Sequence, residues 1–583
     1  MSARALPTAS QTGLVTFTLK VGGRVLGRTY RLKSIVVSRE FNRIPKAILT
    51  LLDGNAATGE FPVSNEATFL PGQLLEISVG YDSTEEPVFK GLIVKQALRI
   101  RPDRSPELTV EARHEAVRMA LARRCRYFND QTDGTVLETL LGDYGLTADV
   151  PATETTHAGL VQYHATDWDF LLARAEANGL LVCAGDEAVK AAKPDFSPEP
   201  ALELTFGATM LAFDAELDAR TQPDGLDAQS WQPADGSRLD LPAAEPGLPE
   251  AGNFSAVELA ASLGQTQTLR HDGGLTPPDL QAWADGRLQR QRLAKLRGRV
   301  RFRGCKALNP GDLVALAGVG ERFSGTVLVS GVRHEISGGA WTTDVQFGLS
   351  PVPFFEETDG LPAVAAPPAG GLLPAVRGLH VGVVTALDDP EGGFRVRVRM
   401  PAVGEADEGV WARMALLDAG SNRGTLFRPE VGDEVVVGFF EDDPRFPVVL
   451  GGLHSAAQPA PLNPTDANPQ KGIFSRENLK LLFDDEKKSI QLETPSGKKI
   501  TLDEQAGTLQ LEDENRNKIT LKKSGVTVES GGNLALKAVG TLSLQAAQLS
   551  LSANASLAVK ATGSLQLESS GTAILKGAVV MIN

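Results

Sequence analysis

Apolar residues recur in pairs near the end of the chain, and this repeat constrains the fold more than any other feature. One residue separates the two members of each pair. Successive pairs start nine to ten residues apart at first and about eight apart later: Ile490/Leu492, Ile500/Leu502, Leu509/Leu511, Ile519/Leu521, Val526/Val528, Leu534/Leu536, Leu542/Leu544, Leu549/Leu551, Leu557/Val559 and Leu565/Leu567. Because strand side chains alternate between two faces, each pair predicts a short strand with one buried face. Turn-formers such as Gly497, Gly507 and Gly531 separate the strands.

A fixed short period indicates a stack of units that bury their apolar face only against neighbours. One repeat buries about 50–100 Å² of apolar surface, which stabilises it by roughly 1–3 kcal/mol, whereas ordering its backbone costs roughly 8–16 kcal/mol. We therefore expect identical partner chains to supply the missing walls, in an intertwined trimeric β-helix, or β-prism, over residues 471–583. A single-chain β-helix and a disordered tail are the alternatives.

Composition excludes several classes of function. The chain has 583 residues and a net charge of −14, so we expect several domains and no general binding to nucleic acid. Its three cysteines, Cys125, Cys183 and Cys305, form no metal-ligand cluster and are expected to be small buried residues in a reducing compartment. The N-terminal residues show no apolar signal segment, and no apolar run is long enough for a membrane span. We expect synthesis in the cytoplasm and release by another route.

The first part of the chain is predicted to be mainly β with minor α. Strand patterns occur within 14–112 and 298–349, and helical spacing occurs at 114–125, 167–178 and 279–297. In the second helix Asp167 is the expected N-cap and Gly179 the expected stop. Residues 215–255 form a variable stretch that is rich in proline and aspartate.

A sequence repeat lies inside this part of the chain. Residues 71–94 and 310–329 both run from Pro-Gly through an apolar strand and a glycine turn to Phe-x-Gly, at Phe89-Gly91 and Phe323-Gly325. A glycine within a strand indicates a bulge or a close backbone approach. The repeat predicts two copies of one β-barrel module, with a chance match as the alternative.

These patterns divide the chain into five segments. They are a hub domain (1–355) with two related β-barrels plus helices, a linker rich in proline, glycine and alanine (356–376), an OB-fold domain (377–455), a second linker (456–470) and the repeat segment (471–583). The third segment has five strand patterns in a short length, which is typical of an OB-like barrel.

Residues 382–456 closely resemble the OB domain of VgrG-like spike proteins. The matching residues are Trp411, Pro429, Gly432, Asp433, Pro444 and Gly451. Residues 89–94, 167–182 and 310–343 are similar to the hub of the same proteins, and the tail is similar to their spike.

The resemblance implies a homotrimeric central spike of a contractile injection system, a phage tail-like particle. Such a spike would sit in the baseplate, adapt the hexameric inner tube protein to a threefold needle, and pierce the target membrane mechanically. Two barrels in each of three chains would make a pseudo-sixfold ring. The resemblance implies neither enzyme activity nor a cofactor, metal or nucleic acid.

The type of machine follows only from details of this resemblance. The second OB strand, near 396–407, lacks the aromatic phrase usual in type VI members. Phrases near the N-terminus resemble the spikes of extracellular contractile injection systems more closely. We expect that group, with type VI secretion and phage baseplates as alternatives.

The end of the chain predicts a binding site for a tip protein. Val579, Val580, Met581 and Ile582 would leave a blunt apolar surface. All seven histidines precede the repeat segment, so a metal-binding tip motif is missing. We expect a separate PAAR-like protein to cap this end.

Candidate chemistry elsewhere is sparse. No nucleophile, phosphate-binding or zinc-protease motif occurs, and the pairs Asp442/Asp443 and Asp484/Asp485 are expected to be solvated turn residues. His334 and Trp341 are expected to pack in a core. The basic run from Arg287 to Arg303 is expected to be a solvated helix face followed by a strand, with a nucleic-acid patch or a contact to acidic baseplate neighbours as alternatives.

An adhesin and a hydrolase are the alternatives to a spike. A trimeric adhesin, or glycan-binding fibre, would need aromatic and polar specificity residues on its tip, and a wall hydrolase would need a catalytic insertion. The sequence shows neither feature.

Overall fold

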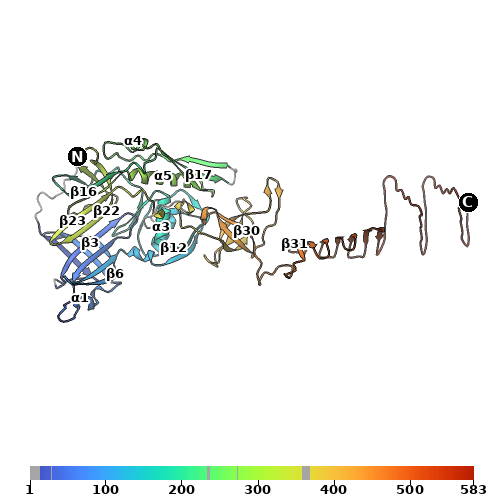
Figure 1. Ribbon diagram of the computed structural model, residues 1–583, viewed down its shortest axis with the longest axis horizontal. Helices are drawn as coiled ribbons and strands as arrows, with labels where there is room; N and C mark the ends of the chain where they lie inside the picture. Colours follow the sequence, from blue (N-terminus) through green and yellow to red (C-terminus); the bar gives the residue numbers. More distant parts are fainter. Residues whose placement is uncertain (1–12, 28, 233–236, 272, 357–367, 583) are drawn as a thin grey trace. The chain divides into compact units, whose positions relative to one another are not determined.

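A computed structural model describes residues 13–27, 29–232, 237–271, 273–356 and 368–582 (Figure 1). The chain forms two compact units, Met1–Gln458 and Pro459–Asn583. The first unit contains the hub and a closed barrel, and the second contains the repeat segment.

The first hub module is a six-stranded part of a larger sheet. In the order β3-β4-β7-β6-β5-β1, its strands are Leu32–Glu40, Lys46–Leu52, Arg104–Arg113, Thr84–Arg101, Leu74–Tyr81 and Val15–Val21, and the short β2 (Arg24–Val25) pairs with β1. Alternation fixes the buried face: Ala47, Leu49 and Leu51 of β4 are inaccessible, whereas the residues between them are half-buried.

The second hub module repeats this strand order. Its strands run β16-β20-β23-β22-β21-β15, with bounds Met210–Leu217, Leu296–Arg303, Ala340–Phe347, Gly325–Ser337, Leu313–Ala317 and Leu202–Thr205. One difference is that β15 is parallel to β21, whereas β1 is antiparallel to β5. The modules keep separate apolar cores, and pairing between β22 and β3 joins them into one sheet of 13 strands.

One type of turn begins three separate sheet segments. Gly72, Gly311 and Gly432 have φ of +96°, +102° and +97°. Their amides donate to the carbonyl oxygens of Ile93, Val329 and Val384 at 2.8–2.9 Å, and each acceptor residue donates back to the residue after the glycine: Gln73, Asp312 and Asp433. This shared turn places Ile93 of the first module at the position of Val329 in the second.

When the two modules are aligned on this turn, the two Phe-x-Gly phrases do not occupy equivalent positions. Gly91 pairs with Leu75, whereas Gly325 pairs with Leu316, two positions further from the turn. Both glycines lie at close approaches: a Cβ on Gly91 would be 2.3 Å from the oxygen of Arg113, and one on Gly325 2.9 Å from Cα of Ala251. Phe89 is buried in the first core, and Phe323 is partly buried against the second.

Helices form a third core in the hub. Helices α2 (Asp133–Gly142), α3 (Asp167–Ala177) and α5 (Pro277–Leu293) pack around an apolar cluster that includes Val136, Leu140 and Phe170. The predicted helix at 167–178 is confirmed, and the one at 279–297 is confirmed as far as Leu293, since residues 296–297 already belong to a strand. The N-cap of α3 is Thr166, whose hydroxyl accepts from the Asp169 amide, whereas Asp167 is buried.

One local prediction for the hub is wrong. Residues 114–125 form a short 3-10 helix, η3 (Glu115–Ala120), followed by β8 (Arg123–Phe128), because pairing with β12 (Leu160–Thr166) overrides the helical spacing. The proline- and aspartate-rich stretch contains β17 (Gly225–Gln232), which pairs with β18 (Ser237–Pro242) and with β19 (Thr266–His271).

Shorter elements complete the hub. They are α1 (Pro62–Asn65), η2 (Ala67–Phe69), β9 (Gln131–Thr132), β10 (Ala148–Asp149), β11 (Thr156–His157), β13 (Leu181–Ala184), β14 (Val189–Ala192), α4 (Ala256–Ala261), η4 (Phe354–Glu356) and η5 (Pro368–Gly371). Much of the predicted linker 356–376 lies outside the described residues. Its last part is not free, because Leu372, Leu373 and Val376 are buried.

The predicted OB-like barrel is confirmed as a closed five-stranded barrel. Its order is β24-β25-β26-β30-β29, with bounds His380–Ala386, Val396–Arg399, Val410–Met414, Pro447–Gly452 and Glu434–Phe439. A hairpin of β27 (Ala419–Gly420) and β28 (Arg423–Gly424) and the short η6 (Phe440–Asp442) lie between its strands. Val161 of β12 is buried in the barrel core, so barrel and hub share apolar contacts.

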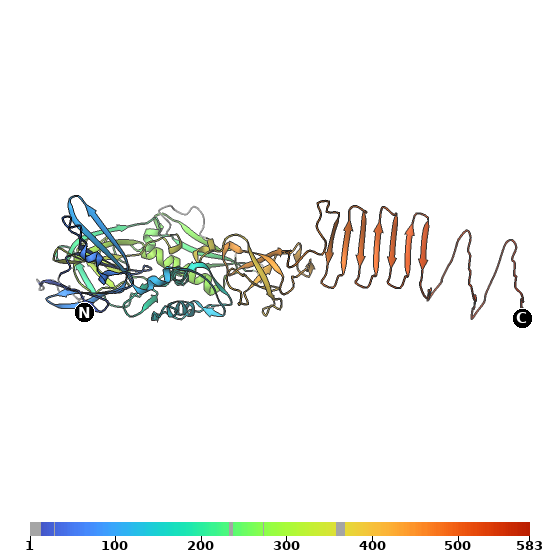
Figure 2. The same cartoon turned by 90° about the horizontal axis from the view of Figure 1, so that it is seen from below.

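The second unit begins with a sheet of seven antiparallel strands in sequence order (Figure 2). These are β31 (Gln470–Phe474), β32 (Lys480–Asp484), β33 (Ser489–Glu493), β34 (Lys499–Asp503), β35 (Thr508–Glu512), β36 (Lys518–Lys522) and β37 (Gly525–Glu529). The predicted pairs from Ile490 to Val528 lie at the second and fourth positions of their strands. No strand is assigned from 530 to 582.

Candidate functional site

One face of the seven-stranded sheet carries two files of apolar residues. Cross-strand pairing aligns Phe483, Ile490, Leu502, Leu509, Leu521 and Val526 in one file, and Leu481, Leu492, Ile500, Leu511, Ile519 and Val528 in the other. Leu492 and Leu511 are 49% and 41% exposed, and Val526 is 66% exposed. An apolar face this extensive is typical of an interaction surface.

The opposite face carries a charge ladder, defined as Lys480, Glu493, Lys499, Glu512, Lys518 and Glu529. Each of these residues pairs directly with the next, so positive and negative side chains alternate along one edge. Lys480 Nζ lies 3.1 Å from a Glu493 carboxylate oxygen. Opposite charges on paired strands favour this register, because a slip would move the ladder residues to the other face.

Beyond the sheet, the predicted tip residues are all exposed. Val579, Val580, Met581 and Ile582 are 75%, 51%, 86% and 85% exposed. The predicted pairs from Leu534 to Leu567 are also exposed, each by more than half. The chain itself therefore covers none of these side chains.

The basic residues from Arg287 to Arg301 form ion pairs within the hub. The prediction of a solvated face is therefore wrong for much of this run. Arg290, Arg292 and Lys295 are 8%, 5% and 5% exposed. From Arg287 to Arg301 the acidic partners are, in order, Glu356, Glu176, Glu245, Glu250, Glu216, Asp214 and Asp344. Arg303 lies over the ring of Tyr81. These charges hold hub segments together, which argues against a nucleic-acid patch.

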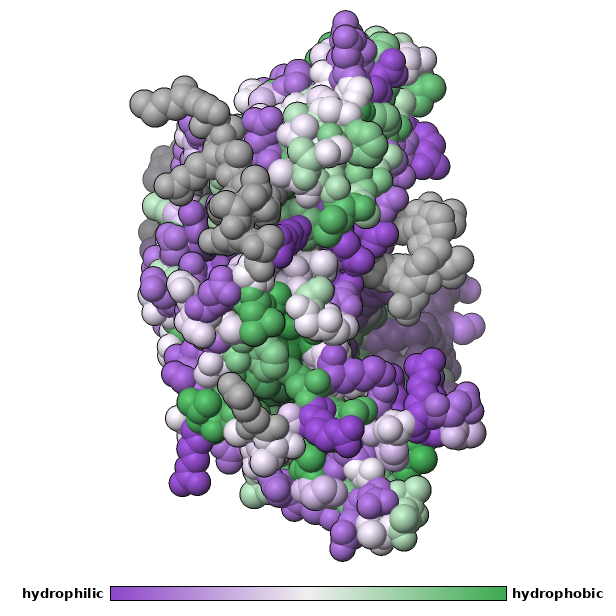
Figure 3. Space-filling view, turned by 90° about the vertical axis from the view of Figure 1, so that its left-hand side faces the viewer, coloured by the Kyte–Doolittle hydropathy of each residue, from purple (hydrophilic) through white to green (hydrophobic). Residues whose placement is uncertain are grey.

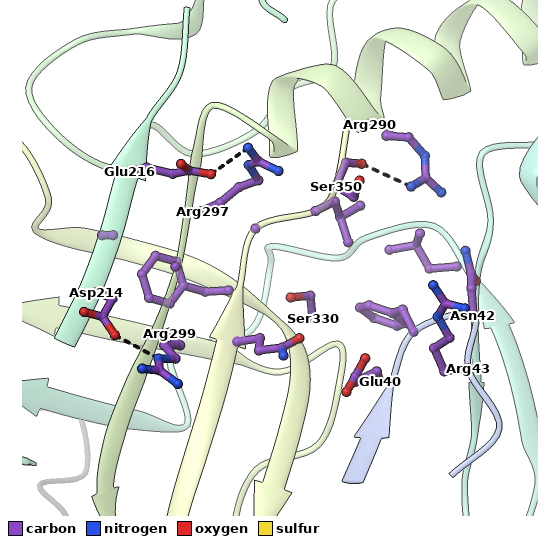
Figure 4. Close-up of a pocket in the computed structure, with 18 of the residues that line it drawn as sticks. Glu40, Asn42, Arg43, Asp214, Glu216, Arg290, Arg297, Arg299, Ser330 and Ser350 are labelled. Atoms are coloured by element: carbon purple, nitrogen blue, oxygen red, sulfur yellow. Dashed lines mark hydrogen bonds and ion pairs between the residues drawn. The ribbon is translucent and has the colours of Figure 1, made fainter. Parts of the chain in front are cut away.

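A cavity of about 570 Å³ lies beside this run (Figure 4). It is lined by the end of β3, by β16, β20 and β23 and by Phe354. Three of its arginines point toward partners: Arg297 toward Glu216, Arg299 toward Asp214, and Arg290 toward the carbonyl oxygen of Ser350. The cavity therefore lies between packed elements of the hub, and the charges of Arg297 and Arg299 in its wall are neutralised by Glu216 and Asp214.

A buried ion-pair network stabilises the helical part of the hub. The Arg174 guanidinium donates two hydrogen bonds to Asp133 at 2.6 and 2.8 Å, and His157 Nε2 lies 3.1 Å from the same carboxylate. Burial alone would raise the pKa of Asp133, but Arg174 and His157 hold it well below its usual range. Arg174 also donates to the carbonyl of Leu372. The network therefore has a structural role.

In each aspartate pair that was expected to be solvated, one aspartate is buried and the other is accessible to solvent. Asp443 is inaccessible to solvent, and its carboxylate is held by Arg445 at 2.8 Å and by His271 at 3.0 Å. Asp484 is 7% exposed and accepts hydrogen bonds from Gln470 and from the Lys487 amide. Only Asp442 and Asp485 are accessible in the expected way.

The OB-motif residues occupy structural positions in the barrel. The ring of Trp411 lies below the guanidinium groups of Arg395 and Arg397, both 5.9 Å from its centroid. The Asp433 carboxylate accepts from the Glu430 amide at 2.8 Å, next to half-buried Pro429 and the Gly432 turn. Pro444 is buried beside Asp443, and Gly451 lies at a bulge between β29 and β30.

The remaining predicted residues are core or isolated. His334 and Trp341 are 6% and 5% exposed, which confirms the packing prediction. Burial raises the pKa of the Cys183 thiol to about 11, so this cysteine is a weak nucleophile. No group of His, Cys, Asp and Glu among the described residues could hold a metal ion. None of the described helices has the length and hydropathy needed to cross a membrane.

Comparison with known proteins identifies families that match two parts of the chain. The family model described as the Alg8 N-terminal domain matches residues 11–338, more than half of the chain. The chain belongs to the Alg8 N-terminal domain family. A second model, the type VI secretion system/phage-baseplate injector OB domain, matches residues 380–454 and coincides with the closed barrel.

Individual relatives confirm the predicted resemblance to VgrG-like spike proteins. The type VI secretion system spike protein VgrG1b of Pseudomonas aeruginosa is 30% identical over 192 residues, covering 31% of this chain and 26% of the relative. VgrG1c of the same organism is 23% identical over 384 residues, covering 61% and 51%. The chain spans about half the length of these curated relatives or less.

One solved structure shares the fold over most of the chain. It is described as the lidded Francisella PdpA-VgrG complex, and it matches with a TM-score of 0.52 and 8% identity, covering 89% of this chain and 80% of that one. At this identity the match establishes the fold alone.

Proposed function

We propose that this chain is the structural spike and hub of a contractile injection system. The exposed apolar files of the second unit carry the proposal, together with the spike relatives. Each large apolar side chain left in water forgoes about 1.5–3 kcal/mol, and the polar face of the same sheet leaves only this face to be covered. Three copies joined through these faces would form the expected trimeric β-helix.

The hub supplies the second half of the proposal. Two modules with one strand order, in each of three chains, would make six similar units around an axis. Such a ring would dock on a hexameric inner tube protein and on baseplate components, while the needle stays threefold. The chain would thus adapt sixfold to threefold symmetry.

The end of the needle would carry a separate tip protein of PAAR type. Support comes from the exposure of Val579, Val580, Met581 and Ile582, which a trimer would gather into one apolar surface. Electron density for a small cap on purified particles is the expected observation. A naked, ordered tip would contradict this part of the proposal.

We propose no catalytic role. The carboxylates of Asp133 and Asp443 are bound by buried arginines, and the relatives are named as spike proteins. The proposed work is mechanical, and it needs a stiff needle that pierces a membrane.

An extracellular particle and a type VI system are the two leading machine types, and a phage baseplate is the third. Phrases near the N-terminus favour an extracellular particle, whereas the curated relatives named as type VI spikes favour a cell-bound machine. Fractionation separates them: an extracellular system places the chain in released, sedimenting particles, whereas a type VI system leaves assembled sheaths inside cells.

Deletion of the gene for this chain tests the function itself. The proposal expects no complete baseplate and no killing or injection activity, with both restored by the full-length chain. Active particles assembled without the chain would refute it.

A further inference from the structure

The two hub modules match in bulges as well as in strand order. Pairing shifts between Ile93 and Lys95 in β6, and between Val329 and Gly331 in β22. On the outer strands it shifts between Leu32 and Ser34 in β3, and between Met210 and Ala212 in β16. Since bulges are specific features of a fold, β6 corresponds to β22, and β3 to β16. A second shift, between Arg99 and Arg101, has no counterpart in β22, but its extra residue lies on β7, so the correspondence along β6 is unchanged.

Within the described part of the chain, the two modules are joined by one strand pairing, between β22 and β3, which we call the joint. The second half of β22 pairs with β3, with Glu335 opposite Val36 and Ile336 opposite Ile35. Through this joint Ile336, from the second module, is buried in the core of the first and is 4% exposed.

The corresponding joint on the other side is open. The second half of β6 pairs only with β7, and β16 pairs only with β20, among the strands that the structure describes. Ile100, the counterpart of Ile336, is 64% exposed, and Leu98, the counterpart of buried His334, is 43% exposed. Leu98 and Ile100 thus leave two apolar side chains on a free strand edge, and the unpaired backbone groups of such an edge can pair with another chain.

We propose that β6 of one copy pairs, antiparallel, with β16 of the next copy, repeating the joint between β22 and β3. Transferring the register places Arg99 opposite Asp214, Ile100 opposite Phe213 and Lys95 opposite Asp218. This register gives one apolar pair and two opposite-charge pairs, whose aspartates also bind Arg299 and Arg220 of their own chain. The ring of Phe213 already packs on Phe347 in the second core, so Ile100 of a neighbour extends that core.

Figure 3 shows one face of the hub, where apolar residues gather among polar ones. Closure of the ring needs no new type of contact, because each chain offers one β6 edge and one β16 edge. The joint rests on the trimer of the proposed function and names the strands that make it.

Disulfide trapping in the full-length chain tests the joint. Paired antiparallel residues have Cα atoms about 4.5–5.5 Å apart, within disulfide range. Oxidised Arg99→Cys/Asp214→Cys is expected to give covalent trimers on a non-reducing gel, since every chain carries both partners. The out-of-register variant Arg99→Cys/Glu216→Cys and the two single variants control for random oxidation. Val36→Cys/Glu335→Cys, at the internal joint, is expected to close within one chain.

The outcomes separate the joint from the proposed function. A trimeric mass by light scattering without covalent trimers would overturn the joint and leave the spike proposal standing. A monomeric mass would overturn both. Hydrogen exchange on the unaltered protein gives a second readout: amides at 95–101 and 210–217 are expected to exchange as slowly as those at 331–337, and fast exchange would overturn the joint.

Discussion

Nε2 of His271 lies 3.0 Å from Oδ2 of Asp443, with both side chains inaccessible to solvent. His271 ends β19 of the hub, and Asp443 follows η6 of the closed barrel. The same carboxylate binds Arg445, and burial of Asp443 would raise its pKa if Arg445 and His271 did not hold it well below its usual range. This polar contact fixes the barrel on the hub, beside the apolar contact of Val161.

Replacing Asp443 is expected to loosen this attachment. Asp443→Asn leaves the buried Arg445 without its counter-charge, and losing one partner of a buried pair costs about 3–5 kcal/mol. Calorimetry of the full-length chain should show the barrel transition at a clearly lower temperature. The neighbouring Asp442→Asn is the control, because its exposed carboxylate should change stability by less than about 0.5 kcal/mol. Equal effects of the two variants would contradict the structural role of Asp443.

The charge ladder is expected to set the stability of the second unit. Glu493→Lys puts three lysines in succession at Lys480, residue 493 and Lys499, and each cross-strand pair is worth about 0.2–1 kcal/mol. The melting temperature of this unit should fall, and added salt should recover part of the loss. Glu504→Lys, in a turn, should have little effect. A loss that salt does not change would exclude an electrostatic role.

Protonation of His334, which lies opposite Val37 where β22 pairs with β3, is expected to destabilise the hub in acid. Burial lowers the pKa of His334 to about 4, so the folded state keeps the ring neutral, whereas the unfolded chain binds a proton near its ordinary pKa of 6.5. Stability is therefore full above pH 6.5 and falls by up to about 3 kcal/mol between pH 6.5 and 4.

The measurement compares unfolding of the unaltered protein and His334→Gln across this range, followed by fluorescence of Trp341, which lies 5.8 Å from the His334 ring. The stability difference between the two proteins should change with pH in the direction given. A difference that stays constant from pH 7 to 4 would show that His334 titrates normally.

A charge in the apolar files is expected to break the trimer. Leu511→Asp places a carboxylate on the face that three copies would bury, where an unpaired charge is strongly unfavourable. Size-exclusion chromatography should show monomers or aggregates. The adjacent Gln510→Asp lies on the polar face and should stay trimeric. Loss of the trimer in both variants would contradict the assignment of the apolar face as the one that the trimer buries.

The sequence predicted local strands well where the pattern itself carries the information. The pairs from Ile490 to Val528 occupy the expected strand positions, because a period of two directly marks one face. Residues 114–125 were mispredicted because β12, distant in sequence, supplies a strand partner that local spacing does not show.

The buried polar residues were harder to predict. Asp443 looked like a turn residue, and only the approach of His271, from 172 positions earlier, explains its burial. The basic run similarly looked solvated, since its acidic partners are scattered from Glu176 to Glu356. The charge ladder, in contrast, was readable in principle, because Lys or Glu flanks successive apolar pairs at fixed offsets.

The absolute mass of the purified full-length chain tests the central claim most directly. One chain is 61.8 kDa, so three times that mass, about 185 kDa, is expected by multi-angle light scattering. The trimer should also resist heated detergent, because its apolar files are covered. A stable, folded species of one chain mass would contradict the spike, since the files would then remain exposed to water.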